Sequence, residues 1–228
     1  MLFRSEVQAD AEAAAGFNRT NRVRSWRLTG NDAARWFSGG RDPEVRAASA
    51  GQFLVEFDGE AILRGLLPSG VYSDLLTRKR GAVISSPRFR VETDHISIRA
   101  MGEHSVARLV VENYAIGNGG LYPAKTLDSD VMTWSMLDTA YRKGSSAYIE
   151  FVTAEDFPRI NLRSGGRRME DGRAYFGVTE VVFHDGAQVP REAPAGLRYV
   201  LDAPAPGTDR ELAQTYADRV AAAGVDWR

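Results

Sequence analysis

Short runs of alternating apolar and polar residues constrain the fold of this chain more than any other feature. Phe89 and Val91 alternate with arginine and glutamate, and Ile96 and Ile98 alternate with serine and arginine. A period of two places one face of a β-strand in a core and the other face toward solvent. The sequence predicts strands over residues 53–57, 71–76, 88–92, 95–99, 106–114, 132–137, 147–152 and 175–183.

Turn-forming residues separate these runs, and we expect turns at residues 92–94, 102–104 and 142–144. No helical pattern lies between the strands, although a parallel sheet requires crossovers of that kind. Many short strands with this spacing favour two antiparallel sheets packed face to face. The sequence therefore predicts a mostly β fold, an antiparallel jelly-roll-like β-sandwich with short N-terminal and C-terminal helices.

The same alternation predicts which side chains face the interior of the sandwich. The expected core residues are Phe89, Val91, Ile96, Ile98, Val110, Ile149, Phe151, Val181 and Phe183.

Both ends of the chain differ in character from the β region. Residues 5–15 are rich in alanine and predict a helix, with Ser5 as its N-cap and Gly16 as its stop. Residues 209–223 predict a second helix, which Thr208 or Asp209 can cap. The domain prediction is an N-terminal helical extension over 1–23, a β-sandwich over 24–188, and a proline-rich linker with the C-terminal helix over 189–228.

Composition excludes several classes of protein. The 228 residues include no cysteine, so disulfides, zinc–thiolate sites and cysteine nucleophiles are excluded. The net charge is −1, and the basic clusters at 78–80 and 163–168 lie in glycine-bounded, turn-like segments. We expect these clusters to be solvated loops rather than a nucleic-acid surface. No apolar run is long enough to insert in a membrane, and the first residues lack the layout of a signal peptide.

The histidines and clustered acids give no assembled catalytic site. His95, His104 and His184 lack the spacing of a metalloprotease pair, and a surface or strand-end position is expected for each. We predict no enzyme and no required cofactor. A hydrolase that uses clustered acids is the least favoured alternative.

Four loop or strand-end acids are candidate ligands of a structural calcium ion, because calcium prefers carboxylate and carbonyl oxygens. They are Asp128, Asp130, Glu155 and Asp156. The alternative is that these acids cap turns and keep loops soluble.

Aromatic residues beside amides suggest a sugar-binding surface. Sugars stack their apolar faces on aromatic rings, while planar polar groups bind the hydroxyls. Asn113, Tyr114, Asn118 and Tyr122 cluster around one glycine-rich loop, and Tyr72 is a further candidate. The alternative for each ring is a place in the core, which we expect for the strand residues Trp134 and Tyr148.

Several blocks in fixed order resemble a known family of domains. The blocks span residues 64–76, 81–89, 110–114, 147–151 and 175–183. Ser86-Pro87-Arg88-Phe89 and Gly177-Val178-Thr179-Glu180-Val181 are the most characteristic parts. From Trp36 to Phe183 the chain resembles the β-sandwich region of planctomycete surface proteins that join a cytochrome-c-like segment to conserved domains of unknown function.

The resemblance implies a layout similar to jelly-roll carbohydrate-binding and galactose-binding-like modules, in an extracellular, periplasmic or cell-surface setting. It brings no catalytic residues, and the haem-binding motif of those proteins is absent here. We therefore expect a non-catalytic module that binds a polysaccharide or oligosaccharide. The alternative is a structural or interaction module that positions neighbouring domains of a parent protein.

Overall fold

The computed structural model describes residues 2–39, 46–49, 52–55, 63–75, 77–114, 123–154, 156, 174–192, 207–208, 210–211, 214–215 and 218. The chain divides into two compact units. One is Val23–Val189, and the other combines Met1–Arg22 with Pro190–Arg228. None of the described helices is long and apolar enough to span a bilayer.

Helix α1 (Leu2–Asn21) belongs to the unit that holds both chain ends. It continues past Gly16, the predicted stop, because a glycine inside a helix costs only about 1 kcal/mol. The Asn18 amide donates a hydrogen bond to the Arg191 carbonyl oxygen and accepts one from the Arg191 N–H, each at 2.8 Å. The Arg191 guanidinium lies 4.5 Å from the centroid of the Phe17 ring. Helix α1 is thus joined to the segment that follows the β unit.

The described residues of the predicted C-terminal helix have helical backbone; they are 210, 211, 214, 215 and 218. Thr208 Oγ1 accepts a hydrogen bond from the Glu211 N–H at 3.2 Å. The Glu211 carboxylate accepts one from the Gly207 N–H at 2.7 Å. A side-chain oxygen that accepts from the N–H three residues later satisfies one of the free N–H groups at a helix start, so Thr208 is the N-cap.

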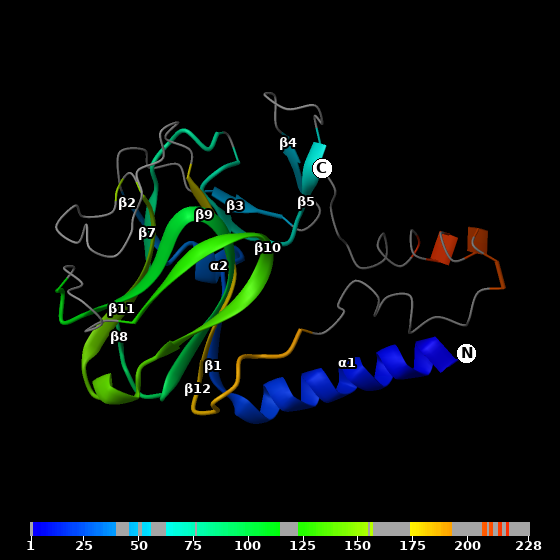
Figure 1. Cartoon of the computed structure of the whole chain (residues 1–228), viewed down its shortest axis with the longest axis horizontal. Coiled ribbons are helices and arrows are strands. Elements are labelled where there is room, and N and C mark those ends of the chain that lie inside the picture. Colours follow the sequence, from blue (N-terminus) through cyan, green and yellow to red (C-terminus); the bar gives the residue numbers. More distant parts are fainter. Residues whose placement is uncertain are drawn as a thin grey trace. The chain divides into compact units, whose positions relative to one another are not determined.

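The β unit is built from antiparallel strands (Figure 1). Its elements are β1 (Arg22–Arg27), α2 (Gly30–Ala33), β2 (Phe37–Gly39), β3 (Arg46–Ala48), β4 (Gln52–Val55), β5 (Leu63–Leu67), β6 (Gly70–Tyr72), β7 (Val83–Ser85), β8 (Phe89–Arg90), β9 (His95–Val111), β10 (Ala124–Asp138), the 3-10 turn η1 (Ala140–Arg142), β11 (Ser146–Thr153) and β12 (Tyr175–His184). The main sheet has the order β2-β7-β11-β9-β12-β6-β3. In addition β10 pairs with β9, β8 with β11 and β1 with β12, while β4 and β5 pair with each other.

The sheet has two halves, one around β11 and the other around β12, and strand β9 belongs to both. Residues 95–103 pair with β12, and residues 105–111 pair with β11. Strand β10 follows the other edge of β9 through both halves, so the two long strands curl together (Figure 1). A strand that bends from one sheet into the next makes a corner of a sandwich.

The predicted turn at residues 102–104 is wrong, because the chain bends there without reversing. His104 has φ 49°, which redirects the strand. A Cβ on Gly102 would lie 2.7 Å from the Tyr175 carbonyl oxygen, so only glycine fits this close approach. Turn chemistry alone does not distinguish a hairpin from a corner inside one strand.

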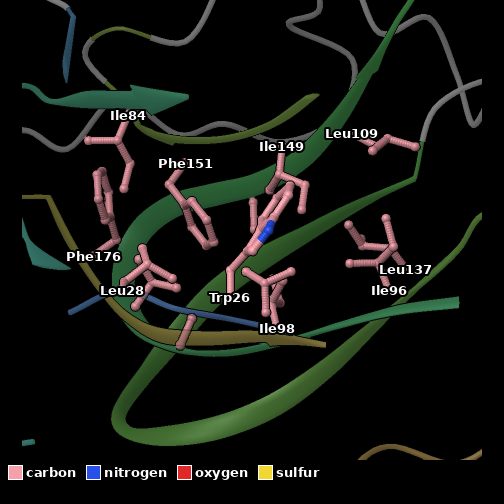
Figure 2. Close-up of a cluster of buried hydrophobic side chains, with 14 of the residues drawn as sticks. Trp26, Leu28, Ile84, Ile96, Ile98, Leu109, Leu137, Ile149, Phe151 and Phe176 are labelled. Atoms are coloured by element: carbon pink, nitrogen blue, oxygen red, sulfur yellow. The ribbon is translucent and has the colours of Figure 1, made fainter. Parts of the chain in front are cut away.

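The main core lies between the two halves (Figure 2). Phe151 of β11 and Phe176 of β12 do not pair, yet their ring centroids are 5.8 Å apart. This contact shows that the halves face each other across a common interior, so the predicted β-sandwich is confirmed. All nine predicted core residues are buried, and eight of them belong to this core. The prediction is wrong for Val110, which lies with its pairing partner Tyr148 on the opposite face of the sheet. A second cluster covers the opposite face of β9 and β12 and contains Ala48, Leu54, Leu67, Tyr72, Met101 and Tyr175.

Candidate functional site

A tight turn at the end of β9 presents the residues that the sequence favoured for ligand binding. Glu112 and Asn113 have φ values of 50° and 64°, and the Tyr114 N–H donates to the Val111 carbonyl oxygen at 2.9 Å. Two consecutive left-handed residues within such a bond are typical of a type I′ turn. Asparagine adopts this conformation readily, whereas glutamate requires support from its surroundings.

That support comes from the first residue of β11. The Glu112 carboxylate accepts a hydrogen bond from the Ser146 N–H at 2.7 Å. The Glu112 N–H donates to the Ser146 carbonyl oxygen at 2.8 Å. The turn is therefore fixed to the sandwich on one side, and its geometry does not depend on the Tyr114 ring.

Tyr114 and Asn113 are both exposed, and Tyr114 has 67% of its surface open to solvent. Tyr114 forms an isolated β-bridge with Val111, and the Leu109 N–H donates to the Pro123 carbonyl oxygen at 3.0 Å. Both ends of this loop are thus held by β9. Asn118 and Tyr122 lie outside the described residues.

Tyr72 has a different environment from the one the sequence favoured. Its side chain is 0% exposed, and its hydroxyl donates to the Pro68 carbonyl oxygen at 2.6 Å. Burial raises the pKa of this hydroxyl above its usual value. The ring packs in the second core cluster over Gly177, whose missing side chain makes room for it. Tyr72 has no face open to a sugar, so it is a core residue.

The candidate calcium ligands are dispersed over different elements. Asp128 and Asp130 are exposed and lie where β10 loses regular register with β9. The Asp156 N–H donates to the Thr153 carbonyl oxygen after the end of β11, and Glu155 lies outside the described residues. Within the described parts of the chain, no three histidine or acidic side chains converge as a metal ion would require. Calcium binding stays a prediction.

His184 is buried rather than superficial, although it ends a strand as expected. Its Nε2 lies 2.8 Å from Ser97 Oγ, and its ring stacks on His95 with 5.6 Å between centroids. Burial lowers the pKa of His184, and the nearby His95 adds to the lowering. A serine nucleophile and its base have such a spacing. Here, however, the two side chains are 0% and 2% exposed, so a substrate cannot reach the hydroxyl.

Two aromatic rings that we expected in the core lie instead on the outer faces of the sandwich. Trp134 of β10 pairs with Arg99, while the neighbouring Leu137 points into the main core. Tyr148 of β11 pairs with Val110 on the face opposite that core. Both rings are half-buried. The alternation in residues 132–137 allows either face to be inward, and only the pairing with β9 selects one.

A buried ion pair lies next to Tyr148. Arg108 and Glu150 are cross-strand neighbours, and Arg108 Nε donates to Glu150 Oε1 at 2.7 Å. Both residues are more than nine-tenths buried. Burial raises the pKa of Tyr148, and the Glu150 charge adds to the rise. Because Arg108 and Glu150 neutralise each other, this pair is a structural contact.

No family model and no curated protein matches the chain. Solved structures with a similar chain path include the Endo-D glycoside hydrolase domain of Streptococcus pneumoniae R6, at 15% identity and TM-score 0.38. The match covers 68% of this chain and 22% of that chain. The K2 cleaved adhesin domain of Lys-gingipain matches at 12% identity and TM-score 0.41, over 70% of this chain and 98% of that chain.

A family 29 carbohydrate-binding module complexed with cellulohexaose matches at 14% identity and TM-score 0.33. That match covers 72% of this chain and 93% of the module. All of these TM-scores lie below 0.5, so the likenesses concern the chain path and carry no information on function.

Proposed function

We propose that this chain is a non-catalytic glycan-binding module whose contact surface includes Asn113 and Tyr114. The exposed Tyr114 ring carries the proposal. An aromatic ring of a folded domain is normally at least half covered, and one that stays open offers a flat apolar face to a ligand. Such a face matches the C–H side of a pyranose ring.

The support beneath Tyr114 suits a binding role. Glu112 and Ser146 hold the turn through backbone and carboxylate hydrogen bonds, so the ring is presented by a fixed turn. Preorganisation of this kind lowers the entropy lost when a ligand binds. Asn113 lies beside the ring and is exposed, and its amide has both donors and an acceptor for sugar hydroxyls.

The chemistry of the described side chains favours binding over catalysis. The serine–histidine contact at Ser97 and His184 is closed to substrate, and the Arg108–Glu150 pair is neutralised. Stacking on one ring adds only about 0.5–1.5 kcal/mol beyond area burial, so binding to a single sugar is expected to be weak. A repeating polysaccharide would compensate through many equivalent sites. Such a ligand, with the family resemblance, supports an extracellular, periplasmic or surface location.

A second candidate function is a module that positions neighbouring domains. The bond pair between Asn18 and Arg191 favours it, because it joins the segments before and after the β unit. If the segments that enter and leave the β unit are bonded to each other, domains attached to these segments would leave in a fixed direction.

Two experiments in sequence test the proposed function. A glycan array first selects candidate polysaccharides, and affinity electrophoresis in gels that contain them then measures binding. The parent chain is expected to be retarded by at least one polysaccharide. Tyr114→Ala should abolish the retardation, and Tyr114→Phe should keep most of it. The melting temperature should change little, because the ring does not support the fold.

Tyr141→Ala is the matched control. Tyr141 is 52% exposed, but it belongs to η1 and its ring is covered by the Arg142 guanidinium at 5.0 Å. Its loss should leave retardation unchanged. A parent chain that no glycan retards, or a Tyr114→Ala variant with full retardation, would contradict the proposal.

A further inference from the structure

Strand β10 has one edge that no other described strand covers. Eleven of its fifteen residues pair with β9, and among the strands that the structure describes it has no second partner. An open edge presents a row of backbone N–H and C=O groups that can pair with another strand. Natural proteins usually protect such edges with charges, bulges or proline.

The two halves of β10 differ in this protection. The first half carries Lys125, Asp128 and Asp130, and its register with β9 shifts on both sides of Ser129. In the second half, the residues from Thr133 to Asp138 pair with β9 in unbroken register. The five residues before Asp138 carry no charge and no proline. Only the second half is therefore a regular, unprotected edge.

The side chains of this stretch are those that protein interfaces favour. Trp134 and Met136 lie side by side on the outer face, and both are half-buried. Arg99 lies opposite Trp134 on β9. Tryptophan, methionine and arginine are enriched at interfaces, whereas lysine and acids are depleted there.

We propose that residues 133–137 of β10 pair antiparallel with the same residues of a second copy of this chain. A twofold axis at Ser135 places Trp134 opposite Met136 of the second copy, and Thr133 opposite Leu137. Sulfur–aromatic contacts of this kind are favourable. Asp138 falls opposite Met132, so no two acids face each other in this register.

The neighbouring register centred on Trp134 would be worse. It would place Asp130 of one copy opposite Asp138 of the other, and like charges directly across a strand pair repel. The register centred on Ser135 avoids this repulsion. A second copy of this chain is the occupant that this pattern fits. If the proposed glycan function holds, the dimer would also carry two Tyr114 surfaces and bind polymers more tightly.

Sedimentation velocity of the full chain at increasing concentration tests the pairing. The parent is expected to form a dimer in a concentration-dependent equilibrium. Met136→Lys and Trp134→Lys place a charge at the edge and should give monomers with unchanged secondary structure. Thr126→Lys changes an exposed residue in the first half of the same strand and should leave the dimer intact.

The absence of cysteine from the chain allows a covalent test. Ser135→Cys creates a single thiol that faces its own copy across the axis, so mild oxidation should give a disulfide-linked dimer on a non-reducing gel. Thr126→Cys should remain monomeric on that gel. A parent that is monomeric at every concentration overturns the proposal. A dimer that survives both lysine substitutions and does not cross-link through Ser135→Cys also overturns it, because another surface must then form the contact.

Discussion

A Cβ atom on Gly102 would lie 2.7 Å from the carbonyl oxygen of Tyr175, and 2.9 Å from the Leu127 Cβ. Gly102 lies on β9 where this strand passes from one half of the sandwich to the other, and Tyr175 begins the strand paired beside it. Both obstructing atoms belong to strands that cannot move independently. The corner of the fold therefore depends on the missing side chain.

Gly102→Ala is expected to lower the free energy of unfolding by about 1–3 kcal/mol, as overpacking does elsewhere. Urea denaturation measures it. Gly16→Ala is the control, because nothing lies within 4 Å of a Cβ at that helical position. That change should be neutral or slightly stabilising. Equal stability of the Gly102→Ala variant and the parent would show that the corner can relax.

A double-mutant cycle should show a coupling energy between Arg108 and Glu150. Glu150→Leu leaves the Arg108 charge buried without its partner and should cost about 3–5 kcal/mol. Arg108→Met together with Glu150→Leu should cost much less, since an apolar pair avoids the desolvation of both charges. Denaturation of the four proteins gives the coupling energy. Additive losses would mean that the two side chains do not depend on each other.

The core could be predicted from the sequence because burial follows a local pattern. Phe89 and Val91, like Ile96 and Ile98, alternate with polar neighbours, and both pairs are buried as expected. Alternation does not predict burial where both faces of a strand are covered, because every residue of the strand is then buried. Gly70, Val71 and Tyr72 are all buried, so alternation does not show which of them face a core. The burial of Tyr72 depends on the second core cluster, which periodicity does not predict.

The site was harder to predict for a related reason. The sequence predicts a strand over residues 106–114, but β9 ends at Val111, and Glu112 and Asn113 have left-handed backbone. The outward direction of Trp134 depends on its pairing with Arg99, which lies 35 residues away in the chain. Periodicity within one strand does not predict contacts between residues so far apart in the chain.

Phe89→Ala is expected to cost about 3–5 kcal/mol, as large-to-small changes of buried aromatic residues do. The Phe89 ring meets the rings of Trp26 and Phe183 edge to face, with centroids 5.5 and 5.1 Å away. Phe37→Ala removes a ring that is 67% exposed and should cost well under 1 kcal/mol. Thermal and urea denaturation of both variants checks the contrast. A loss below 1 kcal/mol for Phe89→Ala would exclude it from the core.

Calcium binding through Asp128 and Asp130 would stabilise the native state by mass action. The prediction is a melting temperature that rises in millimolar calcium relative to excess chelator. Asp128→Asn combined with Asp130→Asn should remove the rise while leaving the melting temperature in chelator unchanged. Superimposed melting curves of the parent in the two conditions would contradict it.

Stability should fall in mild acid because of His184. Its pKa in the folded chain lies below the ordinary value of 6.5, chiefly through burial and further through repulsion by His95. The unfolded chain then binds a proton more readily than the folded chain. The contribution is fully present above pH 6.5 and is lost as the pH falls from that value through the folded pKa. The loss follows a slope of at most about 1.4 kcal/mol per pH unit for one proton.

The groups around His184 separate this effect from others. Ser97 bonds its Nε2 and is uncharged, while Asp185 follows it in the chain. A hydrogen bond from the Asp94 N–H, and then the Lys143 charge, lower the pKa of Asp185 below 3.8. The stability that Asp185 contributes is therefore lost only in a more acidic range. His184→Gln should flatten the slope between neutral pH and the onset of the Asp185 range relative to the parent. Urea denaturation across this pH range measures both slopes, and an unchanged slope in His184→Gln would assign the acid sensitivity to another group.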